Sequence, residues 1–194
     1  AFAAQLSNRL GLELLGTSQA YGKLMAAARG TTLEGKNTRD IFKAVASAGA
    51  VMGLTADEQS GALLAVSQMM SKGTVSAEEL RGQLGERLPG AFKIAAQAMG
   101  VTEAELGKML ESGTLMAEQF LPKFAAELHK TYGQAAVEAG NSGQASFNKL
   151  ANSWDQLKLA LADTGAWSVA LSFVGNLTAG INKLSAATRE AAGT

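Results

Sequence analysis

The stretch GLTADEQSGALLAVSQMMSKG, residues 53–73, contains one complete helix with its start and its stop. Thr55 is followed three residues later by Glu58, the spacing of a capping box, in which each side chain satisfies a backbone N–H that the helix leaves unpaired. Apolar residues then recur at helical spacing until Gly73, a residue type that commonly ends a helix. The apolar stripe consists of Ala62, Leu63, Val66, Met69 and Met70. The stretch therefore predicts a short amphipathic helix that buries one face.

The same start signal recurs twice in the following residues. Ser76 precedes Glu79, and Thr102 precedes Glu105, each at the capping-box spacing. Each such cap contributes about 1 kcal/mol to helix stability. The helix expected from Ser76 ends at Pro89-Gly90. Its apolar stripe is Leu80, Leu84 and Leu88.

Helical periodicity also covers the residues before this region. Leu6, Leu10 and Leu14 predict an N-terminal helix that continues past Gly11 and Gly16 to about residue 25. A polar loop is expected over 30–37. A second helix then follows and stops near Gly53. Its apolar face is Ile41, Val45, Ala48 and Met52.

The residues after Pro89-Gly90 continue the pattern. A short helix is expected from Phe92 to Gly100. Pro122 lies inside an otherwise helical run over 116–132, where an interior proline loses a hydrogen bond and clashes with the preceding turn. We therefore expect a kink or a fresh start there. Phe120, Phe124 and Leu128 nevertheless share one face across it.

A glycine-rich stretch over 133–143 is the predicted internal boundary. It divides the chain into a helical module, residues 1–134, and a C-terminal helical hairpin or extension, residues 135–194, that leads into the rest of a longer protein. Phe147, Leu150, Trp154, Leu157 and Leu161 have the three-four spacing of a helix that packs against another helix. A last helix is expected along Trp167, Leu171, Val174, Ile181 and Leu184.

Composition and hydrophobic pattern together indicate the fold class. The hydrophobic content of 47% is enough for a real core, and 22 glycines against 2 prolines indicate tight joints between helices. No alternating pattern predicts a sheet. We therefore predict an all-α fold, a multi-helix bundle of short amphipathic helices with Gly-rich joints. The formal charge of zero and the lack of a basic cluster argue against sequence-specific nucleic-acid binding.

No group of residues predicts catalysis, a cofactor or a metal. His129 is the only histidine, so zinc cages and triads that need a second one are excluded, and its place in a last helical turn suits the helix dipole. The acidic pairs Asp57-Glu58, Glu78-Glu79 and Glu103-Glu105 all occupy expected first turns, where capping accounts for them. An enzyme built of helices is a further hypothesis, but no catalytic motif in the sequence supports it.

The segment from Thr164 to Asn182 carries no formal charge and is long enough to span a bilayer. It is less apolar than an ordinary spanning helix, because it contains Ser168, Ser172, Asn176, Thr178 and three glycines. A buried or partner-facing helix is the first interpretation. A membrane-active or pore-forming helical protein is the alternative.

Residues Leu63–Glu127 contain a series of short blocks, in this order: Ser67-Gln68, Lys72-Gly73, 75–84 (VSAEELRGQL), 88–91 (LPGA), 99–102 (MGVT), 106–113 and 120–122 (FLP). In these blocks the chain resembles the N-terminal-type conserved region of the tape measure proteins of long-tailed bacteriophages and prophages. The flanks over 15–62 and 147–165 fit that family more loosely, and Met116 stands where a small polar cap residue is expected.

This resemblance implies a structural protein of the virion tail lumen, present in the host cytoplasm during assembly, that sets tail length and leaves ahead of the DNA. It implies tail tube and tail tip proteins and tail assembly chaperones as partners. The resemblance decides neither self-association nor contact with the host membrane through 164–182. Ala1 lies within an apolar helical pattern, so we expect a piece of a longer polypeptide. A continuous helix of this length would reach roughly 290 Å, but the glycine joints favour a compact module.

Overall fold

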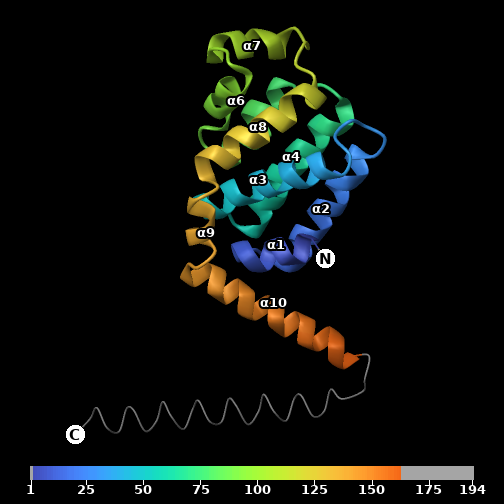
Figure 1. Cartoon of the computed structure of the whole chain (residues 1–194), viewed down its shortest axis with the longest axis vertical. Helices are drawn as coiled ribbons and strands as arrows, with labels where there is room; N and C mark the ends of the chain where they lie inside the picture. Colours follow the sequence, from blue (N-terminus) through green and yellow to red (C-terminus); the bar gives the residue numbers. More distant parts are fainter. Residues whose placement is uncertain (1, 163–194) are drawn as a thin grey trace, which may run out of the picture. The chain divides into compact units, whose positions relative to one another are not determined.

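The computed structural model describes residues 2–162, and these residues form a succession of helices joined by short turns (Figure 1). Within that range the backbone forms no β-strand, only an isolated antiparallel bridge between Thr74 and Met116. The predicted all-α class is confirmed. The helix expected along 167–184 lies outside the described residues. The elements are α1 (Phe2–Leu10), α2 (Leu14–Ala28), α3 (Lys36–Met52), α4 (Ala56–Lys72), η1 (Glu78–Leu84), α5 (Gly85–Arg87), α6 (Ala91–Met99), α7 (Glu103–Glu111), α8 (Ala117–Tyr132), α9 (Ala135–Ala139) and α10 (Gly143–Ala162).

Residues 1–150 form one compact unit and residues 151–194 a second. In the first unit, α2 packs along α4 and α8 packs along α3, while α6 and α7 lie together at the end of the unit opposite α1 (Figure 1). The described part of the second unit is the C-terminal part of α10. The boundary expected between residues 134 and 135 stays a prediction.

The core of the first unit consists of the apolar stripes that the sequence places on each helix. Phe120 and Phe124 of α8 stack with ring centroids 5.1 Å apart, and Tyr21 of α2 meets Phe42 of α3 edge to face at 4.9 Å. Phe2 lies against Tyr21 and so ties α1 to this cluster. The largest fully buried side chains are Phe42, Phe120, Phe124, Leu24, Leu33, Ile41, Leu63, Met69, Leu80, Leu84, Leu88 and Leu106.

Two glycine stops and two of the three predicted capping boxes occur where the sequence predicts them. Gly53 and Gly73 end α3 and α4 with φ values of 69° and 72°, the left-handed region that only glycine enters without strain. Reciprocal capping boxes start α4 at Thr55 and α7 at Thr102. These predictions of helix boundaries are confirmed.

The prediction of one long N-terminal helix past Gly11 is wrong. Gly11 has a φ of 67° and separates α1 from α2, whereas Gly16 lies inside α2. A Cβ at Gly11 would lie 2.1 Å from the Cβ of Ala145, so the backbone of this turn touches the start of α10. α2 then begins with Glu13, whose carboxylate accepts hydrogen bonds from the amides of Leu15 and Gly16.

The third expected capping box, Ser76 with Glu79, is also wrong. Ala77 precedes η1 without a side-chain cap, and the Ser76 hydroxyl donates a hydrogen bond to the carboxylate of Glu79 instead. η1 is a π-helix, a wider helix that proteins use in short pieces. The apolar stripe predicted for this stretch still enters the core. Leu80 and Leu84 of η1, and Leu88 directly after α5, are all fully buried.

Of the kink or fresh start expected at Pro122, the fresh start is wrong, because α8 runs unbroken through it, and the kink stays a prediction. An interior proline costs about 3 kcal/mol. Burial of a large apolar side chain contributes about 1.5–3 kcal/mol, and α8 buries Phe120, Phe124 and Leu128 on one face. The free energy gained by burying these three side chains outweighs the cost of the interior proline.

The seam predicted on α10 is exposed. Leu150 is 68% exposed, Trp154 37% and Leu157 43%, so the expected packing of these three residues against another helix is wrong in the described part of the chain.

Candidate functional site

The acidic residues at helix starts serve as caps. Glu58 accepts a hydrogen bond from the backbone N–H of Thr55, and Glu105 accepts one from that of Thr102. These backbone bonds, followed by the bonds from the threonine hydroxyls, lower the pKa of both carboxyls. A lowered pKa keeps both groups ionised at neutral pH, which suits a cap and not a proton donor.

Glu79 differs from the other acidic residues within 2–162 because its side chain is completely buried. Burial by itself raises the pKa of Glu79, but hydrogen bonds from the Lys72 ammonium and the Ser76 hydroxyl outweigh burial and lower it. Lys72 is half exposed, and its hydrogen bond to Glu79 raises its own pKa. The buried ion pair joins the end of α4 to η1.

Backbone hydrogen bonds also connect this joint to the turn before α8. Val75 donates to the carbonyl of Leu115, and Ala117 donates to the carbonyl of Gly73, both at 2.9 Å. Met116 caps α8 without a side-chain bond, as a methionine must. The turn before η1 and the turn before α8 are therefore held together by the bridge between Thr74 and Met116.

His129 lies exposed in the last turn of α8, in the place that the sequence predicts. It lines a groove of about 290 Å³ between α3 and α8. The other lining residues are Asn37, Asp40, Ile41, Lys43, Ala44, Pro122, Ala125 and Ala126. No cluster of three or more histidine, cysteine, aspartate or glutamate residues that could hold a metal occurs within residues 2–162.

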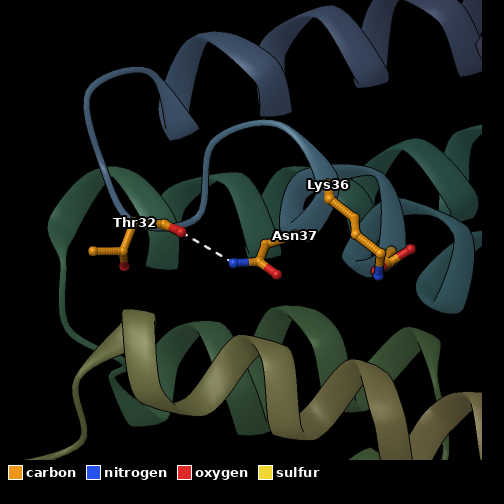
Figure 2. A network of polar contacts seen from close by, with 4 residues as sticks. Thr32, Lys36 and Asn37 are labelled. Carbon is orange, nitrogen blue, oxygen red and sulfur yellow. Dashed lines mark hydrogen bonds and ion pairs between the residues drawn. The ribbon is translucent and has the colours of Figure 1, made fainter.

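Asn37 and Asp40 of the groove lining have partners in their own segment, and Figure 2 shows the partner of Asn37. The Asn37 side chain donates a 3.0 Å hydrogen bond to the carbonyl of Thr32, which fixes the turn before α3. Lys36 pairs with Asp40 one helical turn later at 2.5 Å. These contacts shape the start of α3, and they place no nucleophile beside a base.

A second cavity, of about 410 Å³, lies where the α1–α2 turn meets the α3–α4 turn. Its lining includes Gln59, which is 3% exposed and has neither its side-chain oxygen nor its side-chain nitrogen hydrogen-bonded. Nothing in the sequence singles out this glutamine, because it sits one residue after the Thr55–Glu58 cap in an ordinary first turn. The side chain of Gln59 is buried only by the packing of α3 against it, which the sequence alone does not show.

Among the helices that the structure describes, none combines the length and the apolar character needed to cross a bilayer. The uncharged segment 164–182 lies outside the described residues, so its contact with a membrane stays a prediction.

Comparison with known proteins gives two matches that agree. A family model described as "Tape measure protein" matches residues 1–163. The probable tape measure protein of Salmonella phage Felix O1 (isolate Felix O1-VT1) is 35% identical over 162 residues, which cover 82% of this chain and 22% of that relative. The chain therefore spans about a fifth of the length of the curated relative that it matches. No solved structure matches it.

Proposed function

Since the chain belongs to the tape measure protein family, we propose that it is part of the structural protein that sets the tail length of a bacteriophage. The observation that supports this function most strongly is the family match over residues 1–163. The described residues agree with an architectural role, because their apolar stripes pack into a core and their carboxylates serve as caps and an ion pair. The proposed role is not enzymatic.

The protein would occupy the tail lumen of the virion, and the host cytoplasm while tails assemble. Its partners there would be tail tube and tail tip proteins and the tail assembly chaperones. Residues 135–194 would form the helical extension that leads from this module into the rest of the protein. Release from the tail would precede genome delivery.

Residues 2–150 act in this proposal as a folded module and not as the ruler. A ruler must add a fixed length per residue, and a continuous helix of these residues would add roughly 220 Å at 1.5 Å per residue. The packing of α2 on α4 and of α3 on α8 folds the chain back on itself instead. The length-measuring region would then lie in other parts of the protein.

Electron microscopy of virions that carry in-frame deletions in the parent protein tests both statements. Deletions in a ruler region should shorten tails in step with the residues removed. Deletion of 2–150 should prevent normal tail assembly without giving uniformly shorter tails. Unchanged tail length with every deletion would refute the tail-length function. Tails shortened by roughly 220 Å after deletion of 2–150 would refute the proposal that these residues are a folded module and not the ruler.

A further inference from the structure

We propose that residues 167–184 of this chain fold back along α10 as an antiparallel helix and cover the exposed apolar seam of α10. Residues 167–184 lie outside the described residues, so their placement is the content of the proposal. The inference concerns this chain alone and does not depend on the tail-length function. The seam positions are Phe147, Leu150, Trp154, Leu157 and Leu161.

The seam lies on the side of α10 opposite to its contact with the α1–α2 turn. Ala145 lies against Gly11, and the Asn148 side chain donates a 2.8 Å hydrogen bond to the carbonyl of Gly11. At about 100° per residue, Leu150 lies roughly 160° around the helix from Asn148, and Leu157 lies roughly 180° from it. Leu150 and Leu157 are accordingly 68% and 43% exposed, so another segment has to cover them.

The chemistry of the seam defines the segment that fits it. Apolar residues at three-four spacing pack best on a second helix that carries apolar residues at the same spacing. The charges of Lys158 and Asp155 are paired with each other within α10 at 2.5 Å. A helix that covers the seam therefore needs an apolar stripe and no charged groups of its own.

The sequence that follows α10 has both properties. Residues 164–182 carry no formal charge, and the apolar positions around them mirror those of the seam. Counted outward from Thr164, both sets lie 3, 7, 10, 14 and 17 residues away. An antiparallel hairpin centred on Thr164 therefore places each seam residue opposite one position of the second set. The facing pairs are Leu161–Trp167, Leu157–Leu171, Trp154–Val174, Leu150–Thr178 and Phe147–Ile181.

The centre of this mirror pattern coincides with a sequence suited to a turn. Residues 163–166 read Asp-Thr-Gly-Ala and separate the end of α10 from Trp167. Antiparallel helices are joined by loops of about 2–5 residues, and glycine is the residue type that most often ends a helix. As helices, 147–161 and 167–181 would have equal lengths of about 21 Å. So short a loop also gives this segment a high effective concentration beside the seam, which favours it over a separate molecule.

Disulfide trapping in the full 194-residue chain tests the proposal, because the chain contains no cysteine of its own. Leu150→Cys combined with Thr178→Cys places one thiol at each of two facing positions. The control is Leu150→Cys combined with Asn176→Cys, because position 176 lies on the opposite face of the proposed helix at a similar distance along the chain. With glutathione disulfide as oxidant, the 150–178 bond should form within one chain about tenfold faster than the 150–176 bond. In one continuous helix, positions 150 and 178 would be about 42 Å apart, too far for a disulfide.

A charge in the seam should weaken the hairpin. Leu157→Asp in the 150–178 cysteine protein should slow disulfide formation about tenfold, because the carboxylate would be buried between the two helices. Gln156→Asp adds the same charge at an exposed position on the other side of α10. It should leave the rate unchanged.

Disulfide-linked dimers in place of the intrachain bond would overturn the proposal and assign the seam to a second copy of the chain. Equal rates for the two cysteine pairs would overturn it as well. Absence of the 150–178 bond, together with flotation of the chain on phosphatidylcholine–phosphatidylglycerol vesicles, would overturn it and assign 164–182 to a membrane. None of these results bears on tail length, which is measured on virions.

Discussion

Glu79→Gln removes the buried charge at the joint between α4 and η1 while keeping the shape of the side chain. A hydrogen bond to a charged group contributes about 1.5–3 kcal/mol and a neutral one about 1 kcal/mol. The carboxylate accepts from Lys72 and Ser76 through different oxygens. The amide of glutamine has one acceptor oxygen, so Lys72 would donate to a neutral oxygen and the Ser76 hydroxyl would have to accept from the amide N–H. Water screens the contribution of the Lys72–Glu79 ion pair, because Lys72 is half exposed. We therefore expect the free energy of unfolding to fall by about 1–2 kcal/mol at neutral pH.

The difference between the two proteins should depend on pH with a definite sign. The pKa of Glu79 in the folded chain lies below its ordinary value of 4.5, so its charge stabilises the fold fully above pH 4.5 and loses this effect as the pH falls through the lower, folded-state pKa. The gap between the unchanged protein and Glu79→Gln should narrow on acidification. Glu58 and Glu105 also have lowered pKa values, but they affect both proteins equally.

Urea unfolding followed by the helical circular dichroism signal, at neutral pH and at steps below pH 4.5, measures both effects. Glu78→Gln is the control, because Glu78 is an exposed neighbour in the same turn, and its loss should change stability by less than about 0.5 kcal/mol. Equal stability of Glu79→Gln and the unchanged protein at neutral pH would refute the reasoning. A gap that stays constant as the pH falls would refute it as well.

Three further predictions concern the core, a turn and a cap. Phe120→Ala, at a fully buried ring, should lower the free energy of unfolding by about 3–5 kcal/mol, whereas Leu64→Ala on the exposed side of α4 should cost far less in the same urea titration. Gly73→Ala, at φ 72°, should cost about 1–2 kcal/mol, whereas Gly22→Ala, inside α2 with open space around its Cβ, should stabilise by about 0.5–1 kcal/mol; a shared sign in thermal melts would contradict this. Thr102→Ala should cost about 1 kcal/mol and speed amide exchange in the first turn of α7.

The helices and their ends could be predicted where the signal is local. Capping at Thr55 and Thr102 and the stops at Gly53 and Gly73 depend on residues a few positions apart, so the sequence contains the whole interaction. The predicted resemblance to tape measure proteins over 63–127 is likewise confirmed by a match that extends over residues 1–163.

The features that could not be predicted depend on contacts between distant segments. Gly11 breaks the N-terminal helix at a turn that touches Ala145, which is remote in sequence. Glu79 sits at capping-box spacing from Ser76, but Lys72 at the end of the preceding helix takes part in binding its carboxylate, and the box does not form. Pro122 is tolerated because the α8 face on either side of it is buried.

Gln59 was missed for the same reason. Its position in a first helical turn predicts an exposed polar side chain, and only the packing of α3, with Gly49 opposite, buries it.

The short, glycine-punctuated helices of this chain are stable only because their apolar faces pack on one another. Helices of this length are marginal alone in water. Hydrogen exchange followed by mass spectrometry on the chain tests the claim directly. We expect peptides from α3, α4 and α8 to be strongly protected and to lose that protection together when Phe120→Ala is introduced. Independent exchange of each helix, with α3 and α4 unaffected by the substitution in α8, would contradict the account.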